Sequence, residues 1–319
     1  QCQTSSEPGW EHSEVDGLEA LATALTAAGL ADGVGRDYPI GSLTTYRVGG
    51  TASVFVRPVD ADELEAVVGA ATACEVEILL VGLGSNLLVS DGGFTGLAVQ
   101  LGGGFGSIAV SGQMVTAGGA TSLPVLARRT VADGLTGFEW AVGVPGSIGG
   151  AVRMNAGGHG SDMAAVLEEA TTIDLRTGAC KVRPVESLSL GYRTSGVGSA
   201  ELVTSVVLRL EDSVSGAGEE TLAGIVRWRR ENQPGGRNAG SVFTNPPGDS
   251  AGRLIDDAGL RGHRHGSAVV SERHTNFIQV DEGGSADDVD ALMGEVVRRV
   301  LEVHGIRLHT EIVMVGFSQ

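Results

Sequence analysis

The chain has 319 residues, 42% of them hydrophobic, which is enough for two or three compact domains with ordinary cores. Its formal net charge of −17 argues against a nucleic-acid-binding protein, because neutralising phosphate groups requires a basic face. No apolar run approaches the roughly 20 residues of a membrane span. Cys2, Cys74 and Cys180 lie far apart without a CxxC pair, which predicts no disulfide or metal framework and a cytoplasmic location.

Five segments place apolar residues at the spacing of an amphipathic helix. They are residues 15–30, 60–73, 122–133, 221–232 and 285–304. Asp60 is the expected N-cap of the second helix, and Ser285 with Asp288 resembles a capping box at the start of the last. The buried face of that last helix is expected to carry Val289, Leu292, Val296, Val300 and Val303.

Short apolar stretches between these helices predict strands. They are residues 53–57, 77–81, 98–101, 114–117, 169–175, 202–210 and 311–315. Strands outnumber helices through the first half, which indicates an α+β fold with two small sheets. The polar residues 1–14 are expected to be a disordered tail, and the charged stretch 211–220 marks a boundary between domains at 15–212 and 213–319.

Two glycine-rich strips stand out among the 50 glycines of the chain. Residues 143–158 read GVPGSIGGAVRMNAGG, and residues 81–86 read VGLGSN at the end of an apolar run. Such glycine density is unlike an ordinary buried strand and lets the backbone approach a ligand closely. Two such turns, each after a strand-like run, predict a dinucleotide whose phosphates bind main-chain N–H groups.

Three polar residues occur where a purely structural role would be unusual. Arg193 lies in GYRTS, Ser241 in the turn-rich NAGSVFTNP, and Glu311 begins the last predicted strand. These groups could bind a carboxylate substrate, donate a proton and stabilise an enolate. Each also has a plainer alternative: a solvated charge for Arg193, a turn hydroxyl for Ser241 and a rim charge for Glu311.

Seven motifs occur together in one order between Ser42 and Gly316. They are LTTYRVGG, VGLGSNLLVSDGGFTG, GVPGSIGGAVRMNAGG, GYRTS, NAGSVFTNPPG, VSERHTNFIQV and the closing Glu311. In this the chain resembles the UDP-N-acetylenolpyruvoylglucosamine reductase (MurB) family. The short passage from SVFTNP to AGRLIDDAGL, without a long insertion, is similar to the type II branch of that family.

The resemblance implies an FAD-binding domain of the vanillyl-alcohol oxidase/p-cresol methylhydroxylase type, built from two α+β subdomains, and a C-terminal α/β substrate-binding domain. It implies NADPH-dependent reduction of UDP-N-acetylglucosamine enolpyruvate to UDP-N-acetylmuramate, through non-covalent FAD, in peptidoglycan precursor synthesis. The expected partners are UDP-N-acetylglucosamine enolpyruvate and NADPH, with no nucleic acid, no membrane and no metal. The expected state is a monomer.

The resemblance also implies roles for single residues. Flavin N5 would deliver hydride, Arg193 and Glu311 would stabilise the resulting enolate, and Ser241 would protonate it. The expected FAD contacts are Tyr46, Gly82, Leu83, Gly84, Ser85, Asn86, Pro145, Gly146, Ser147, Gly149, Gly150, Asn155 and Gly157. The expected substrate contacts are Arg229, Asn245, His274 and Asn276.

Two departures from the family pattern bear on these contacts. Asn232 stands where the family usually has a lysine three residues after Arg229, and His159 replaces a common tyrosine in NAGGHG. The sequence leaves two other functions open. One is an oxidase of the same flavoprotein superfamily, and the other is a nucleotide-sugar-binding module that has lost its flavin.

Overall fold

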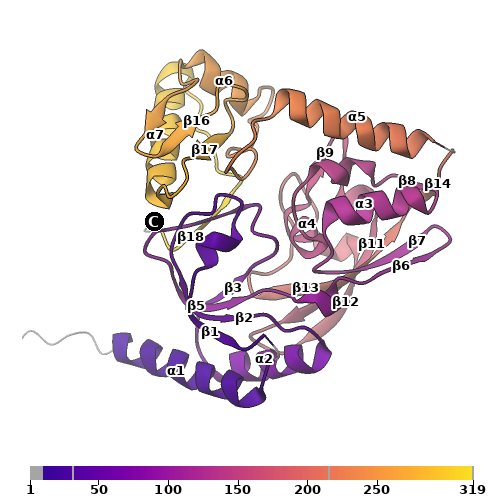
Figure 1. Ribbon diagram of the computed structural model, residues 1–319, viewed down its shortest axis with the longest axis vertical. Helices are drawn as coiled ribbons and strands as arrows, with labels where there is room; N and C mark the ends of the chain where they lie inside the picture. Colours follow the sequence, from indigo (N-terminus) through magenta and orange to yellow (C-terminus); the bar gives the residue numbers. More distant parts are fainter. Residues whose placement is uncertain (1–9, 31, 215, 318–319) are drawn as a thin grey trace, which may run out of the picture.

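The computed structural model describes residues 10–30, 32–214 and 216–317. Figure 1 shows three units: an N-terminal unit over helices α1 and α2, a middle unit beside it, and a C-terminal unit coloured orange to yellow. Of the tail expected at residues 1–14, residues 1–9 lie outside the described residues, and Trp10 begins a helix. None of the described helices has the length and apolarity needed to cross a membrane.

The N-terminal unit is a mixed four-stranded sheet in the order β1-β2-β5-β3. The strands are β1 (Val34–Tyr38), β2 (Ala52–Val56), β3 (Ile78–Leu80) and β5 (Phe94–Val99), with η1 (Ile40–Leu43) between β1 and β2. Helices α1 (Trp10–Ala28) and α2 (Ala61–Ala73) cover one face, and Leu21 and Val67 are fully buried there. The Asp60 carboxylate accepts a hydrogen bond of 2.9 Å from the Glu63 N–H, which confirms the predicted N-cap.

The middle unit is an antiparallel five-stranded sheet in the order β12-β11-β13-β7-β6. Its strands are β6 (Ile108–Ser111), β7 (Met114–Gly118), β11 (Leu167–Asp174), β12 (Cys180–Pro184) and β13 (Glu201–Arg209). The four-stranded and five-stranded sheets of the first two thirds of the chain confirm the expected α+β class. The short pieces around this sheet are η2 (Gly103–Phe105), β8 (Leu135–Thr136), β9 (Gly157–Gly158), β10 (Ser161–Asp162), η4 (Met163–Ala165), η5 (Val185–Leu188) and β14 (Glu211–Asp212).

Three helical segments pack in the core of the middle unit: α3 (Leu123–Ala132), η3 (Glu139–Gly143) and α4 (Ile148–Met154). Sequence reasoning missed α4, because its Gly149 and Gly150 lower helix propensity. The helix is fixed at both ends. The Ser147 hydroxyl accepts from the Gly150 N–H at 3.3 Å, and Asn155 ends it with φ +39°.

The C-terminal unit follows the long helix α5 (Ala217–Asn232). Its elements are α6 (Ala251–Asp257), β15 (Arg264–His265), β16 (Ala268–Val270), β17 (Ile278–Val280), α7 (Ala286–His304) and β18 (Val313–Val315). Figure 1 shows α5 running across the top from the middle unit toward the C-terminal unit. Ile225 of α5 belongs to the core of the middle unit, so this helix joins the two units physically.

Helix α7 begins as predicted but differs in detail. The Ser285 hydroxyl accepts from the N–H groups of Asp287 and Asp288 at 3.1 and 3.2 Å, as an N-cap should. The capping box is not reciprocal, because the Asp288 carboxylate instead accepts from the backbone and hydroxyl of Ser267. The prediction that Val303 is buried is wrong, since the last turn of the helix leaves it 44% exposed.

The last strand returns to the beginning of the fold. β18 pairs in parallel with β4 (Leu87–Val89), directly after the VGLGSN turn. The strand expected at residues 311–315 is therefore shorter, and Glu311 lies in the segment that leads into it. Tyr46 and Val48 of the LTTYRVGG motif belong to the core of the C-terminal unit. These contacts hold the C-terminal unit against the N-terminal one.

Candidate active site

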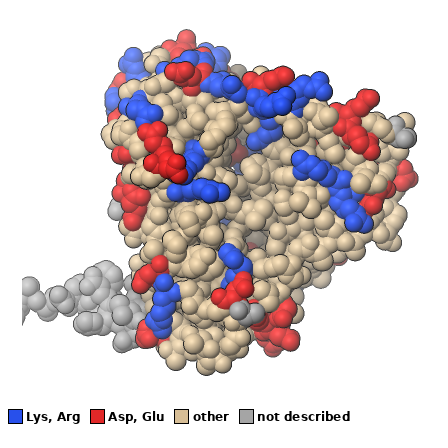
Figure 2. Space-filling model, in the orientation of Figure 1, with Lys and Arg blue, Asp and Glu red and all other residues tan. Residues whose placement is uncertain are grey.

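A cavity of about 720 Å³ lies where the three units meet. Its walls come from residues 78–87, from the strip 143–158, from α5 and from the segments around Ser241 and Glu311. Figure 2 shows this face hollowed between the units, with Lys and Arg atoms along the border of the hollow under α5. A volume of this size is in the range of about 300–1,000 Å³ typical of cofactor and ligand sites.

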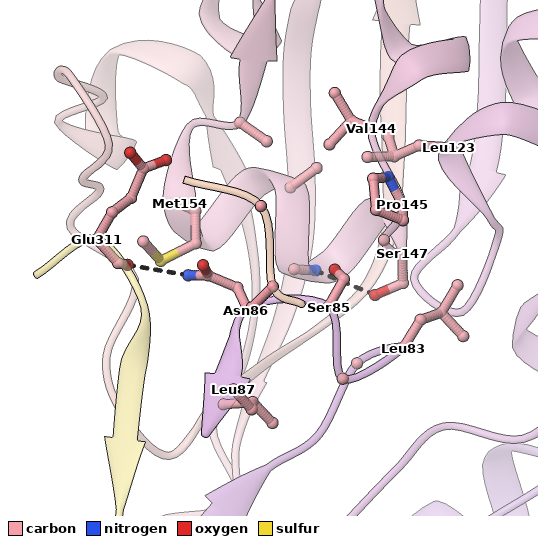
Figure 3. A pocket seen from close by; sticks show the side chains of 18 of the residues that line it. Leu83, Ser85, Asn86, Leu87, Leu123, Val144, Pro145, Ser147, Met154 and Glu311 are labelled. Atoms are coloured by element: carbon pink, nitrogen blue, oxygen red, sulfur yellow. Dashed lines mark hydrogen bonds between the residues drawn. The ribbon is translucent and has the colours of Figure 1, made fainter. Parts of the chain in front are cut away.

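The two glycine-rich strips face each other across one side of the cavity. A Cβ placed on Gly82 would lie 2.7 Å from the Ser147 hydroxyl oxygen, and one on Gly146 would lie 3.2 Å from that of Ser85. Figure 3 shows Ser85 and Ser147 on these two loops. The strips therefore approach so closely that side chains at these glycines would separate them. The glycines leave the backbone at these positions free of side chains.

Gly84 is the glycine whose replacement should cost most in this cradle. Its φ is +66°, and a Cβ there would overlap the Leu43 carbonyl oxygen. We expect Gly84→Ala to shift the 82–86 loop, because alanine is strained at this φ and backbone blocks its side chain. The variant should retain less flavin after gel filtration than Gly69→Ala, whose Cβ would meet no atom within 4 Å. Equal flavin content in the two proteins would contradict this expectation.

Most of the residues expected to contact FAD line this cavity. They are Gly82, Leu83, Gly84, Ser85, Asn86, Pro145, Gly146, Ser147, Gly150 and Gly157. Gly149 instead lines an adjoining cavity of about 80 Å³. Tyr46 is fully buried in the C-terminal core, and burial raises the pKa of its phenol. Asn155 is buried too. Its amide donates to the Gly191 carbonyl at 2.9 Å and so supports the loop that carries Arg193.

Arg193 and Glu311 meet in the cavity wall. The Arg193 Nε lies 2.7 Å from Glu311 Oε1, and the side chains are 24% and 17% exposed. A second Arg193 nitrogen donates to the Gly157 carbonyl at 3.1 Å, which links the pair to the glycine strip. The backbone of Arg193 has φ +56°, an unusual conformation for a non-glycine residue. This strained backbone conformation is tolerated where the guanidinium points at Glu311.

Glu311 is held by backbone on both sides. Its N–H donates to the Val242 carbonyl at 2.7 Å, and its own carbonyl accepts from the Asn86 amide at 3.1 Å (Figure 3). Burial raises the pKa of the Glu311 carboxyl above its ordinary value, and the neighbouring Arg193 charge offsets this only in part. A carboxyl in this setting can be protonated at a higher pH than a surface glutamate.

Ser241 lines the same cavity, one residue before the backbone that pairs with Glu311. Gly240 before it has φ +80°, and the Asn238 side chain accepts from the Gly240 N–H at 3.0 Å. Within the described chain, the Ser241 hydroxyl makes no hydrogen bond to another protein group. It is therefore available to a ligand. The structure thus brings Arg193, Ser241 and Glu311 to one cavity.

Of the expected substrate contacts, Arg229 alone lines the cavity. Burial lowers the pKa of its guanidinium, and in the described residues no carboxylate forms an ion pair with it. Asn245 accepts from the Ala251 N–H at 3.0 Å, outside the cavity wall. His274 and Asn276 also lie outside the wall, and burial lowers the pKa of His274.

Sequence reasoning missed Trp228 and Gln233, which line the cavity beside Arg229. The Trp228 ring is 46% exposed and meets the His159 ring edge-on, with centroids 5.2 Å apart. Trp228 and Arg229 follow the buried Ile225 by three and four residues, so helical periodicity could have placed them on the inner side of α5. Asn232 donates to the Trp228 carbonyl at 2.8 Å and is absent from the cavity wall.

Two protein-family models match the chain. One is described as an FAD binding domain and matches residues 52–182, and the other, described as the C-terminal domain of UDP-N-acetylenolpyruvoylglucosamine reductase, matches residues 232–315. A protein of Paramagnetospirillum magneticum named UDP-N-acetylenolpyruvoylglucosamine reductase is 44% identical over 285 residues, covering 89% of this chain and 92% of that protein. The chain belongs to the UDP-N-acetylenolpyruvoylglucosamine reductase family.

Other members of the reductase family agree with this. The Bacillus subtilis protein of that name is 37% identical over 281 residues, which cover 87% of this chain and 92% of that protein. The crystal structure of UDP-N-acetylenolpyruvylglucosamine reductase (MurB) from Thermus caldophilus superimposes with a TM-score of 0.76 at 36% identity, covering 88% of this chain and 98% of that one. The predicted family, fold class and class of enzyme, an FAD-dependent reductase, are confirmed.

Proposed function

We propose that this chain reduces UDP-N-acetylglucosamine enolpyruvate to UDP-N-acetylmuramate at the expense of NADPH, in the synthesis of peptidoglycan precursors. The observation that carries this proposal is the meeting of Arg193, Ser241 and Glu311 in one cavity lined by the two glycine strips. In this proposal the enzyme is cytoplasmic, monomeric and of type II.

The strips fit a flavin dinucleotide in their chemistry and their shape. Cβ atoms on Gly82 or Gly84 would clash with the neighbouring loops, so the backbone has no side chain between it and a ligand. Residues 82–86 and 145–150 would hold the dinucleotide non-covalently through main-chain groups. FAD bound there would supply two-electron chemistry, taking hydride from NADPH and passing it to the enolpyruvyl group.

Arg193 and Glu311 would bear the charge that this reaction creates. Hydride addition to the terminal carbon of the enolpyruvyl ether leaves negative charge on the adjacent carbon and on the carboxylate of the substrate. The Arg193 guanidinium would stabilise that charge as a fixed cation. Glu311 would add to it as a neutral acid, and burial favours its protonated form.

Ser241 would end the reaction by proton transfer. Its hydroxyl would donate a proton to the carbon that carries the negative charge, which completes the D-lactyl ether. A serine hydroxyl is a weak acid, so its position close to that carbon matters more than its pKa. The backbone bonds that place the following residue, Val242, against Glu311 support such positioning.

The inner side of α5 would bind the nucleotide portion of either substrate. Both NADPH and the sugar nucleotide carry a diphosphate, and Arg229 is a half-buried cation without a carboxylate partner among the described residues. Trp228 presents an aromatic face at the same wall. The chain has a formal net charge of −17, so a local cation of this kind is needed to hold an anionic ligand.

Anaerobic titration of the purified protein with NADPH tests the proposed function. The flavin absorbance band should bleach on reduction and return rapidly when the enolpyruvyl sugar nucleotide is added, but only slowly with oxygen. Rapid reoxidation by oxygen alone would favour a flavin oxidase. A colourless protein that takes up no FAD would favour a binding module.

A further inference from the structure

Asn276 lies in the loop between β16 and β17 and is 4% exposed. Its side chain makes two hydrogen bonds to the backbone of one residue, Phe243. The Phe243 N–H donates to Asn276 Oδ1 at 3.0 Å, and Asn276 Nδ2 donates to the Phe243 carbonyl at 2.8 Å. The Asn276 backbone carbonyl also accepts from the Val242 N–H at 2.9 Å. The amide thus pairs with this segment as the peptide group of a neighbouring strand would.

The opposite edge of the same segment pairs with the residues around Glu311. The Glu311 N–H donates to the Val242 carbonyl at 2.7 Å, and the Thr244 N–H donates to the His309 carbonyl at 2.9 Å. Phe243 and Thr310 form an antiparallel bridge between them. The short segment that starts at Ser241 is therefore held from both edges, by Asn276 on one side and by residues 309–311 on the other.

Asn276 does not have the properties of a ligand contact. It is absent from the cavity wall, and both polar atoms of its amide are used by Phe243. The neighbouring His274 ring accepts from the Asn276 N–H at 3.3 Å, which fixes the loop further. Its hydrogen bonds are instead to the backbone of Val242 and Phe243, the two residues that follow Ser241.

We infer that Asn276 is a positioning residue that fixes Ser241 relative to Glu311 for proton transfer, and not a substrate contact. The inference rests on the proposed function, because it gives Ser241 the role of proton donor. It adds a residue that acts on the second half of the reaction through backbone alone. Loss of the amide should displace the Ser241 hydroxyl while the glycine strips stay in place, because those strips make no contact with Asn276 in the hydrogen-bond network of the described chain.

Stopped-flow measurement of both half-reactions in Asn276→Ala tests the inference. We expect reoxidation by the enolpyruvyl sugar nucleotide to slow about 10- to 30-fold, less than the roughly 100-fold that a 1 Å misplacement can cost. Flavin reduction by NADPH should stay within about twofold of the parent protein. The matched control is Thr275→Ala. It removes one side-chain hydrogen bond, 2.6 Å to the Gly252 carbonyl, from a residue as buried as Asn276, without touching the Ser241 segment.

Asn276→Asp provides a conservative variant with a signature of its own. At low pH the protonated carboxyl can donate to the Phe243 carbonyl as the amide did, whereas the ionised carboxylate opposes that carbonyl oxygen. The defect in reoxidation should therefore shrink as the pH falls toward the pKa of the introduced carboxyl and grow as the pH rises above it. A residue needed only for overall folding would lower both half-reactions together and would not restore one of them selectively.

The double variant with Ser241→Ala separates this inference from the proposed function. If Asn276 acts through Ser241, Ser241→Ala with Asn276→Ala should reoxidise within about twofold of Ser241→Ala alone. If the rate losses of the two single variants multiply in the double variant, the inference is overturned. It is also overturned if Asn276→Ala slows both half-reactions equally or slows neither. The same selective loss in Thr275→Ala would overturn it too. If Ser241→Ala alone reoxidises at the parent rate, the proposed role of Ser241 fails, and a selective defect in Asn276→Ala would then also contradict action through Ser241.

Discussion

Ser241→Ala should slow reoxidation of the reduced flavin by the enolpyruvyl sugar nucleotide by on the order of 10²-fold or more. The reason is that the substrate carbon, once it has received hydride, loses the hydroxyl that would protonate it. Flavin reduction by NADPH requires no such proton and should remain nearly intact. Stopped-flow absorbance measures the two half-reactions separately, so the ratio of the two losses is the decisive quantity.

A matched control for this variant is Thr244→Ala in the same segment. The Thr244 hydroxyl donates to the His309 carbonyl at 3.3 Å and is absent from the cavity wall. We expect both half-reactions of this control to stay close to those of the parent protein. If Ser241→Ala slows both half-reactions by the same factor, the serine supports the fold of the cavity and is not the proton donor.

Local patterns predicted much of the fold from the sequence. Asp60 and Ser285 cap helices because a side-chain oxygen at that position satisfies free N–H groups within the next three residues. The apolar period of α7 correctly placed Val289 and Val296 in the core. These signals depend on neighbours a few residues away, so one sequence contains them. The glycine strips belong to the same class, although the helix α4 within the second strip was not foreseen.

Long-range hydrogen bonds explain what sequence reasoning could not place. The Asn86 amide reaches the Glu311 carbonyl across 225 positions of the chain, and the Asn276 amide reaches Phe243 across 33. An asparagine in a loop has no period that reveals its partner. The resemblance to a family placed Asn276 near the substrate. A matching motif, however, cannot show whether a residue contacts a ligand or hydrogen-bonds to the backbone of a neighbouring segment.

Burial explains a second group of differences. Tyr46 was expected to contact FAD, yet it is fully buried in the core of the C-terminal unit with Val48 nearby in the chain. Whether an aromatic residue within a motif faces a ligand or a core depends on which unit packs over it. That packing is set by the return of β18 to β4, a parallel pairing of strands more than 200 residues apart.

Glu311→Ala should slow flavin reoxidation by about 10²- to 10³-fold, the usual cost of losing one group that stabilises a developing anion. Glu311→Gln should lose less, because the neutral amide can still donate a hydrogen bond as a protonated carboxyl would. The same stopped-flow assay measures both variants. Glu282→Gln is a suitable control, because Glu282 pairs with Arg237 at the same 2.7 Å but is 89% exposed on the surface.

The pH dependence of Glu311→Gln decides which protonation state of Glu311 is active. Burial raises the pKa of Glu311, so the carboxyl is neutral below that pKa and ionised above it. If the neutral acid is the active form, the reoxidation rate of the parent protein should fall as the pH rises through that pKa, and in Glu311→Gln this fall should be absent. The Arg193 charge favours the ionised form, so in Arg193→Ala the fall in rate should occur at higher pH. A parent rate that instead rises through this pKa would assign the stabilising role to Arg193 alone, with Glu311 as the carboxylate that orients it.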